Sequence, residues 1–315
     1  VPIAERFCDR SPYEIEYDGK NMMLSKNGKL LMPIEIIRRP DWYNFKLDQN
    51  IFMHDIFQVH GTTTLVNSEY MCCDYYKEGH GCLFCSFPMN KSVDKINLSY
   101  ISRTLECATA ENPRYSITLS GGCKKSHDHG SKFFVDIIKT IKKIDDNIPI
   151  SVELAPPDEN FYITELIDLG VSALIMNIEF YDFKIRSLLC PEKSKIKVER
   201  YFQALDYSVS CLGKGNASSV LIVGLEDLNL TKECADILIE MGVIPTLIPF
   251  RPYDNCYLSN FTTTNPICLT EAAEYVGKKL LKANLHPKNQ RGCTECGGCS
   301  LEIDFEKYLN NIGVY

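Results

Sequence analysis

The stretch Ala173-Leu174-Ile175-Met176-Asn177-Ile178-Glu179 decides the fold that this sequence predicts. It is apolar almost throughout, and a short apolar run is typical of a parallel β-strand that is buried on both faces of its sheet. Similar runs predict further strands at residues 62–67, 115–119, 148–154, 218–224 and 245–250. We therefore expect a buried parallel sheet as the centre of the molecule.

Helical patterns separate the predicted strands. Examples of the expected helices are residues 132–144, 161–169, 198–212, 231–241 and 269–285. Six alternating strand and helix units predict an α/β fold of the partial (β/α)6 TIM-like barrel type, which is three quarters of the eight-unit barrel. In such a barrel the chemistry lies at the carboxyl ends of the strands.

The two ends of the chain differ from this central region. Residues 13–17 alternate in polarity, Asp18-Gly19 and Asn27-Gly28 are hairpin turn signals, and residues 30–37 contain another apolar run. The predicted domains are a small β-rich extension at residues 1–60, the partial barrel at residues 61–287 and a cysteine-rich tail at residues 288–315.

Composition limits the classes of protein to which the chain can belong. A formal net charge of −7 argues against a nucleic-acid surface, because phosphate binding requires clustered positive charge. No stretch is apolar enough to cross a bilayer, and the first residues lack a signal-peptide core, so we expect a cytoplasmic protein with no membrane partner. The cytosol keeps thiols reduced, so the 15 cysteines are not expected to form disulfides. So many thiols suggest an anaerobic host.

Three cysteines, Cys73, Cys82 and Cys85, follow the first predicted strand of the barrel. Three thiolates can hold three irons of a 4Fe–4S cluster and leave the fourth iron open to a ligand that is not protein. Cys72 is an alternative to Cys73 as the first ligand. A structural zinc site is an alternative to the cluster, because Cys-x2-Cys pairs in cytosolic proteins often bind zinc.

This motif resembles that of the radical S-adenosylmethionine (SAM) superfamily. The usual signature there is Cys-x3-Cys-x2-Cys with an aromatic residue before the last cysteine, which is Phe84 here. The present chain departs from it in the first gap, which is eight residues long. The resemblance covers roughly residues 62–300 and is strongest to biotin-synthase-related members.

The resemblance implies SAM-binding roles for residues that follow the other strands. Ser120, Gly121 and Gly122 look like the glycine-rich segment that hydrogen-bonds the methionine amino group of SAM. Asn177 and Glu179 are similar to an Asn-x-Glu segment whose carboxylate holds the ribose hydroxyls of SAM.

Further contacts with SAM are implied by the last two strands. Gly224 resembles a glycine that packs near the adenine, and Leu247 would contribute an apolar contact to the same ring. Glu153 and Arg200 could contact SAM or substrate, or serve as structural ion-pair partners.

The reaction also follows from the resemblance. SAM chelates the open iron through its amino and carboxylate groups, one electron from the reduced cluster cleaves it, and the resulting 5'-deoxyadenosyl radical abstracts a substrate hydrogen. The expected cofactors are therefore a 4Fe–4S cluster and SAM. The expected partners are a small-molecule or carrier-bound substrate and an electron donor such as flavodoxin or ferredoxin.

The tail contains a second cysteine motif, Cys293, Cys296 and Cys299, with glycines that allow the chain to wrap tightly around a cluster. It predicts a second, auxiliary 4Fe–4S cluster, with structural zinc as the alternative. The fourth ligand could come from Cys256, Cys190 or Cys123. Alternatively, the fourth iron is open and holds substrate or donates a sulfide.

A barrel with both clusters resembles biotin and lipoyl synthases, which use the sulfur of an auxiliary cluster to form carbon–sulfur bonds. Our leading hypothesis is radical sulfur insertion at an unactivated carbon. The first alternative is a rearrangement, a C–C cleavage or a methylation, with the tail cluster as an electron relay or substrate anchor. The second is a non-catalytic iron–sulfur or zinc-binding module.

Overall fold

The computed structural model describes residues 11–68, 70–71, 73–86, 92–93, 96–254, 256–286, 296 and 298–311. The chain forms two compact units, one that ends at Asp41 and a main unit that begins at Trp42. The boundary between the two units at Asp41 lies earlier in the chain than residue 60, the expected end of the β-rich extension. Cys72 and Cys293, two of the candidate ligands, lie outside the described residues.

The first unit is a small antiparallel sheet. Its strands are β1 (Tyr13–Tyr17), β2 (Met22–Lys26) and β3 (Lys29–Ile34), in the order β1-β2-β3. Asn27 and Gly28 both have positive φ angles, 51° and 74°, as a tight turn between twisted strands requires. The β-hairpins predicted at the two Asx-Gly pairs are therefore confirmed.

The main unit is built on a seven-stranded sheet with the order β14-β13-β12-β11-β10-β7-β6. Its strands are β6 (Phe57–His60), β7 (Thr64–Asn67), β10 (Ser116–Leu119), β11 (Ile150–Glu153), β12 (Val171–Ile175), β13 (Ala217–Val223) and β14 (Ile244–Pro249). All neighbours pair in parallel except β6, which pairs antiparallel with β7 at one edge. The six predicted strands and the partial barrel are confirmed.

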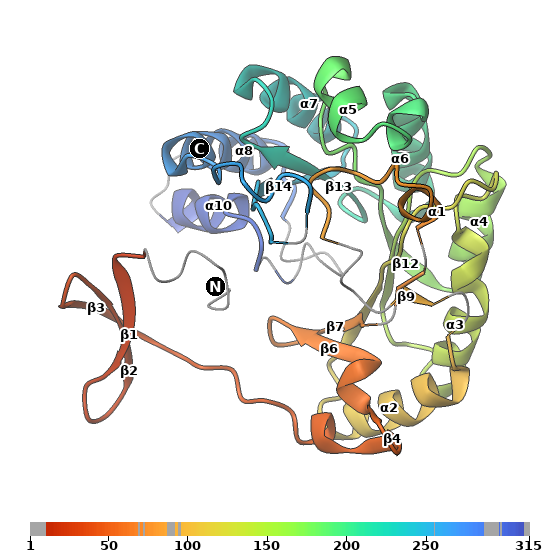
Figure 1. The fold of residues 1–315 in the computed structure, drawn as a ribbon, viewed down its shortest axis with the longest axis horizontal. Coiled ribbons are helices and arrows are strands. Elements are labelled where there is room, and N and C mark those ends of the chain that lie inside the picture. The colour runs from red at the N-terminus through yellow and green to blue at the C-terminus, as the bar shows by residue number, and fades with distance from the viewer. Residues whose placement is uncertain are drawn as a thin grey trace. The chain divides into compact units, whose positions relative to one another are not determined.

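Helices α2 to α8 lie in an arc around the outside of this curved sheet (Figure 1). They are α2 (Leu98–Glu111), α3 (Ser131–Ile144), α4 (Phe161–Asp168), α5 (Phe183–Leu189), α6 (Val198–Leu212), α7 (Leu228–Glu240) and α8 (Pro266–Lys282). The shorter α1 (Asp74–Lys77) precedes them, and α10 (Glu302–Asn311) packs on α8. No helix in the described part of the chain is both long and apolar enough to cross a membrane.

Short elements complete the main unit. They are the strands β4 (Lys46–Asp48), β5 (Ile51–Phe52), β8 (Tyr70–Met71) and β9 (Ser92–Val93), and the 3-10 helices at Asp41–Asn44, Met53–Asp55 and Lys193–Lys195.

Local chemistry sets where the helices begin. The side chains of Asp182 and Asp227 accept hydrogen bonds from the first amides of α5 and α7, and Asn265 does so for α8, which continues with a proline. Apolar side chains of α2, α3, α4, α6, α7 and α8 belong to the main core together with those of the strands. The main core therefore lies between these helices and the sheet.

Candidate functional site

The cysteine loop, residues 73–85, lies at the carboxyl end of β7. The amide of Asp74 donates a hydrogen bond to the carbonyl of Cys123 (3.0 Å), and the amide of Leu83 donates to the carbonyl of Leu189 (2.8 Å). Two other segments of the barrel therefore hold the loop near both of its ends.

The three thiols of this loop line one cavity of about 170 Å³, together with residues that follow β10, β11 and β12. We call it the cysteine cavity. Its described lining consists of Cys73, Tyr76, Cys82, Phe84, Cys85, Ser120, Gly121, Gly122, Cys123, Glu153, Leu154, Ala155, Asn177, Glu179 and Lys193. The fold thus brings the cysteine motif, the glycine segment and the Asn-x-Glu segment to one place.

The glycine segment is fixed between two of these walls. The side chain of Asn67, at the end of β7, accepts from the amide of Ser120 (2.7 Å) and donates to its carbonyl (2.9 Å). Gly122 packs against Cys73 so closely that a Cβ on Gly122 would lie 2.5 Å from Cys73 Cβ. Only glycine fits at this position without moving the first cysteine of the loop.

Asn177 and Glu179 follow the end of β12, and both are hydrogen-bonded to β13. The amide oxygen of Asn177 accepts from the backbone of Val220 (3.1 Å), and its nitrogen donates to Glu153 Oε1 (2.5 Å). Glu179 has a φ of 70°, which is costly for a residue other than glycine. Its backbone hydrogen bond to Val220 (2.9 Å) helps to hold that conformation.

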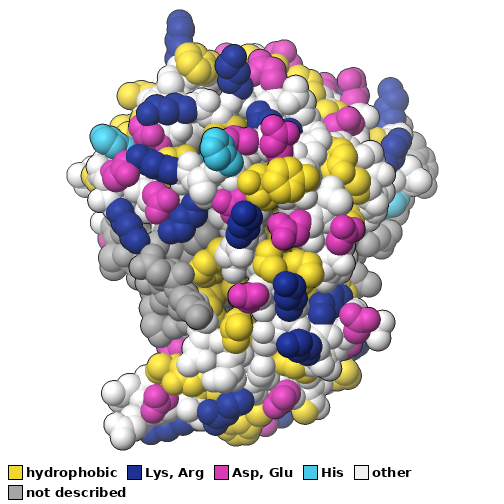
Figure 2. Space-filling model, turned by 90° about the vertical axis from the view of Figure 1, so that its right-hand side faces the viewer, with side chains coloured by type: hydrophobic (Ala, Val, Ile, Leu, Met, Phe, Trp, Pro, Cys, Tyr) yellow, Lys and Arg dark blue, Asp and Glu magenta, His cyan; other side chains and the backbone are white. Residues whose placement is uncertain are grey.

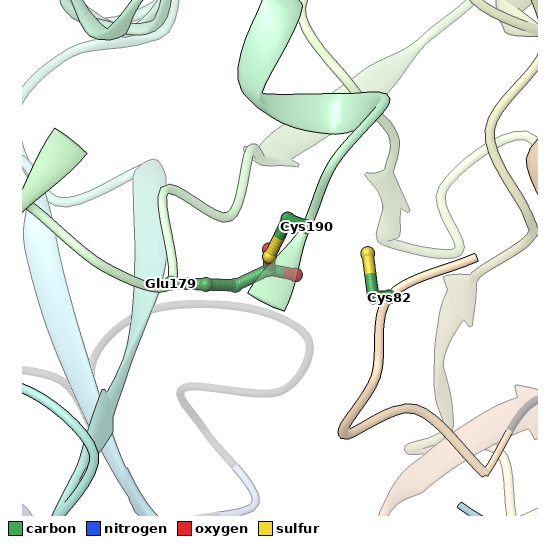
Figure 3. Close-up of side chains that lie close together, drawn as sticks. All are labelled: Cys82, Glu179 and Cys190. Carbon is green, nitrogen blue, oxygen red and sulfur yellow. The ribbon is translucent and has the colours of Figure 1, made fainter. Parts of the chain in front are cut away.

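The carboxylate of Glu179 has two partners and is 8% exposed. Oε1 accepts from Lys193 Nζ at 2.8 Å, and Oε2 accepts from Cys190 Sγ at 3.6 Å. Figure 3 shows Cys190 beside this carboxylate, with the sulfur of Cys82 facing both. The ligand atoms of Cys82, Glu179 and Cys190 lie within 4.8 Å of one another, so this group could hold a metal ion.

Lys193 is the buried cation of the cysteine cavity. Burial is the largest single influence on the pKa of Lys193 and acts to lower it. The negative groups nearby, Glu179 first among them, together outweigh burial, so the pKa of Lys193 lies well above its ordinary value. Burial also raises the pKa values of the Cys123 and Cys190 thiols, and Lys193 counteracts this only in part. In the metal-free protein these two thiols are therefore protonated.

Arg186 fixes the segment from which Lys193 projects. It is 1% exposed, and its guanidinium donates to the backbone carbonyls of Ile178 (3.3 Å), Lys193 (3.3 Å), Ser194 (3.4 Å) and Ile196 (2.9 Å). It also lies over the ring of Tyr201, 4.9 Å from its centroid. One side chain thereby holds the Lys193 segment to the end of β12.

Other expected site residues do not belong to the described lining of the cysteine cavity. Leu247 is fully buried in the main core, and Gly224, with a φ of 106°, packs against the side chain of Thr264. Cys256 packs in a small apolar cluster with Phe180 and Cys190, and Cys82 and Phe84 of the cysteine loop pack against the same cluster.

Arg200 lines a second cavity, of about 590 Å³, and donates to the carbonyl of Pro157 (2.7 Å) and to Asn160 Oδ1 (2.8 Å). Most of the lining of this cavity is charged and includes the pair Lys195 and Glu192 (2.6 Å). Figure 2 shows that acidic and basic side chains are also interspersed over the side of the main unit that carries α3 and α4.

The described tail cysteines have different surroundings. Cys296 is half-buried and Cys299 is exposed. A Cβ built on Gly61, in the turn between β6 and β7, would lie 3.2 Å from Cys296 Sγ. The tail therefore contacts the turn that precedes β7, whereas the cysteine loop follows that strand.

Sequence reasoning missed three features of the cysteine cavity: Asn67, Lys193 and the position of Cys123. Asn67 ends a buried apolar run, which was a usable signal. Lys193 lies far from any strand end in the sequence, and its position depends on long-range bonds from Arg186. Cys123 directly follows the glycine segment but was considered only for the tail cluster.

Comparison with known proteins identifies relatives of the fold. No protein-family model matches the chain. It is 22% identical over 301 residues to the bacteriochlorophyllide c C-7(1)-hydroxylase of Chlorobaculum limnaeum, covering 87% of this chain and 74% of that protein.

Two solved structures share the architecture. The radical SAM methyltransferase from Sphaerobacter thermophilus superposes with a TM-score of 0.52 at 14% identity, over 87% of this chain and 77% of that one. SuiB from Streptococcus suis superposes with a TM-score of 0.51 at 12% identity, over 73% of this chain. The match spans about half, 49%, of the SuiB chain. These similarities establish the partial barrel as the fold.

The cysteine cavity has the donor set that an iron–sulfur cluster requires. Its sulfur atoms are ligands for iron in such clusters, and the carboxylate and ammonium opposite them suit a polar ligand on the cluster. The two glycines in the lining have no side chain and let a ligand approach the backbone closely.

Proposed function

We propose that this chain is a radical SAM enzyme and that Cys73, Cys82 and Cys85 hold its 4Fe–4S cluster. The observation that carries the proposal is the single cavity in which these thiols meet the glycine segment and the buried carboxylate of Glu179. With SAM bound, the cluster supplies the 5'-deoxyadenosyl radical that abstracts a hydrogen from the substrate. The likeness in fold to a radical SAM methyltransferase supports this reading.

The residues of the cavity receive the following roles. Ser120, Gly121 and Gly122 bind the amino acid part of SAM through their backbone, and Glu179 accepts hydrogen bonds from the ribose. Asn177 orients Glu153 and anchors the segment to β13. Gly224 and Leu247 lie outside the described lining of the cavity, and their contact with the adenine stays a prediction.

The outcome of the reaction is functionalisation of an unactivated carbon. Our first candidate is sulfur insertion, with an auxiliary 4Fe–4S cluster on Cys293, Cys296 and Cys299 as the sulfur source. Cys256 stays a candidate for its fourth ligand. The substrate is a small molecule or a carrier-bound chain, Arg200 contacts it from the second cavity, and a flavodoxin or ferredoxin supplies the electron.

The second candidate is a different radical outcome, in which the tail cluster relays electrons or anchors substrate. It is supported by the name of the relative in Chlorobaculum limnaeum, which is a hydroxylase, and by the methyltransferase with the same fold. Loss of sulfide from the tail cluster during turnover distinguishes the two, because only sulfur insertion consumes it.

The first test needs no substrate. The protein is reconstituted anaerobically, its iron, sulfide and zinc are measured, and 5'-deoxyadenosine is followed after dithionite and SAM are added. About eight irons per chain with deoxyadenosine release support two clusters and the proposed function. Bound zinc, or iron without SAM cleavage, refutes it and favours a metal-binding module.

A further inference from the structure

Cys123 is a fourth thiol in the cavity that contains the three thiols of the cysteine loop. It directly follows Gly122, which packs against Cys73, and its own carbonyl accepts the hydrogen bond from the amide of Asp74. Two backbone contacts therefore hold Cys123 beside the first ligand of the loop. Within the described lining of this cavity there is no fifth cysteine.

We propose that Cys123 is the protein ligand of the fourth iron when SAM is absent. This inference rests on the proposed function, because it requires a cluster in the cysteine cavity. A cubane cluster has four irons, and each of them needs a ligand. The cavity offers four thiols to meet that need.

The charges in the cavity are suited to a fourth thiolate. Lys193 places a buried ammonium in the same lining, 2.8 Å from the Glu179 carboxylate. A cysteine binds iron as a thiolate, so the thiol of Cys123 would lose its proton when the cluster forms. The nearby ammonium would then offset part of the added negative charge.

Binding of SAM then exchanges one ligand for another at the fourth iron. The iron–sulfur bond to Cys123 breaks, and bonds form from the same iron to the amino nitrogen and a carboxylate oxygen of SAM. The ammonium of SAM loses one proton, and the sulfur of Cys123 gains one, so protons and charge balance without an electron transfer. Until SAM binds, the sulfur of Cys123 occupies the ligand position on the fourth iron.

Cys190 is the competing thiol. Its sulfur lies within 4.8 Å of the sulfur of a loop cysteine, Cys82, and it contacts Glu179, but it does not belong to the described lining of the cavity. Replacement of Cys190 therefore tests whether this thiol, rather than Cys123, binds the fourth iron.

The experiment measures loss of one iron from the cluster. The full chain with Cys296 and Cys299 replaced by alanine is reconstituted anaerobically, so that the signal comes from the cysteine cavity. Cys123→Ala, Cys123→Ser and Cys190→Ala are added to this background. Each protein is oxidised with ferricyanide without SAM and with SAM, and the 3Fe–4S form is quantified by electron paramagnetic resonance.

Without SAM, Cys123→Ala is expected to give several-fold more of the 3Fe–4S form than the parent, because its fourth iron lacks a thiolate. Cys190→Ala is expected to match the parent, and the Cys123 effect should vanish with SAM present. The serine variant keeps the shape of Cys123 and separates loss of the ligand from misfolding. If the background itself binds too little iron, the same variants are compared in the chain with its tail cysteines intact.

Equal yields of the 3Fe–4S form in the parent and in both Cys123 variants overturn the inference, as does an effect confined to Cys190→Ala. Neither result contradicts the proposed function, because the protein contains a cluster in either case. An unmodified protein that binds no iron overturns the proposed function and this inference together.

Discussion

The cysteine loop, residues 73–85, and the cysteine tail, residues 288–315, contain the same types of residue in different surroundings. Each has a Cys-x2-Cys pair and a nearby glycine, and each lies close to a buried carboxylate, Glu179 in one case and Glu302 in the other. Gly122 has no room for a side chain and Glu179 is paired with Lys193. A side chain would fit at Gly298, because a Cβ there would lie 3.4 Å from Cys296 Sγ. Neither carboxylate oxygen of Glu302 has a hydrogen-bond partner among the described residues.

The two sets of thiols differ in how firmly the protein itself holds them in place. The loop is held by hydrogen bonds, by close packing and by an ion pair, so its thiols already share a cavity. Among the described tail residues, Cys299 is exposed, and burial raises the pKa of the Glu302 carboxyl to about 7. We expect the loop to behave as a preformed site and the tail as one that metal binding completes.

The largest expected effect contrasts the two cysteine sets. Cys85→Ala should reduce SAM cleavage to background, because two remaining loop thiolates hold a cubane poorly. The measurement is 5'-deoxyadenosine released after reduction, with iron content determined on the same sample. Retained cleavage would refute the assignment of the loop as the SAM cluster.

Cys296→Ala is the matched change in the tail. It should remove about four irons per chain but leave SAM cleavage intact, because the loop cluster keeps all of its ligands. If the tail cluster serves the chemistry, product formation is lost once a substrate is known. A fall in SAM cleavage equal to that of Cys85→Ala would show that the two sets form one site.

A second contrast replaces the glycines. Gly122→Ala should abolish iron binding at the loop, since its Cβ would lie 2.5 Å from Cys73 Cβ and both groups are held by backbone. Gly298→Ala should leave the iron content nearly unchanged, because its Cβ would meet only Cys296 Sγ, at 3.4 Å. Iron analysis after reconstitution checks both, and equal losses would mean that the tail is as tightly built as the loop.

The third contrast concerns the buried ion pair of the loop. Lys193→Met leaves Glu179 without its cation and should lower the free energy of unfolding by about 3–5 kcal/mol. Denaturant unfolding of the metal-free protein measures this. The double variant Glu179→Gln with Lys193→Met serves as control and should recover most of the loss. A double variant as unstable as the single one would show that the pair contributes through packing alone.

The smallest effect is the pH dependence of the tail helix. Burial raises the pKa of Glu302 from 4.5 to about 7. A carboxyl whose pKa is raised on folding contributes stability that is complete below pH 4.5 and is lost as the pH rises through about 7. Glu302→Gln stays neutral, so it should be more stable than the unmodified protein by up to about 3 kcal/mol above pH of about 8, at 1.36 kcal/mol per pKa unit.

The comparison for Glu302→Gln is made by thermal or denaturant unfolding across this pH range. The gain should shrink towards zero near pH 4.5, where both states of the unmodified protein are protonated. A constant difference at all pH values would mean that the substitution acts through packing and that Glu302 is not a buried acid.

Strands and helices of the barrel were predictable because their signals are local. An apolar run such as β13 is recognisable in the sequence since both of its faces are buried. The rule that function lies at the carboxyl ends of strands then located Ser120 and Glu179 correctly beside the cysteine loop. β6 was not recognised as part of the main sheet, because a four-residue edge strand has too short a pattern.

The remaining part of the site depends on contacts between distant segments. Nothing near Lys193 in the sequence indicates that Arg186 will bind four carbonyls and direct this lysine towards Glu179. The same holds for Cys256, which was considered for the tail cluster and packs with Phe180 and Cys190. Contacts of this kind depend on how the backbone folds, and the spacing of residues in the sequence does not predict them.

The contact between Gly61 and Cys296 has a consequence for the order in which the protein matures. It joins two segments that are separated in the sequence by nearly the whole main unit. Bringing such distant segments together costs chain entropy, so we expect this contact to form only after the sheet has folded. During synthesis, the loop cysteines and the strands that surround them leave the ribosome long before the tail does. We therefore expect a cluster assembly system to fill the two sites in succession, with the barrel site first.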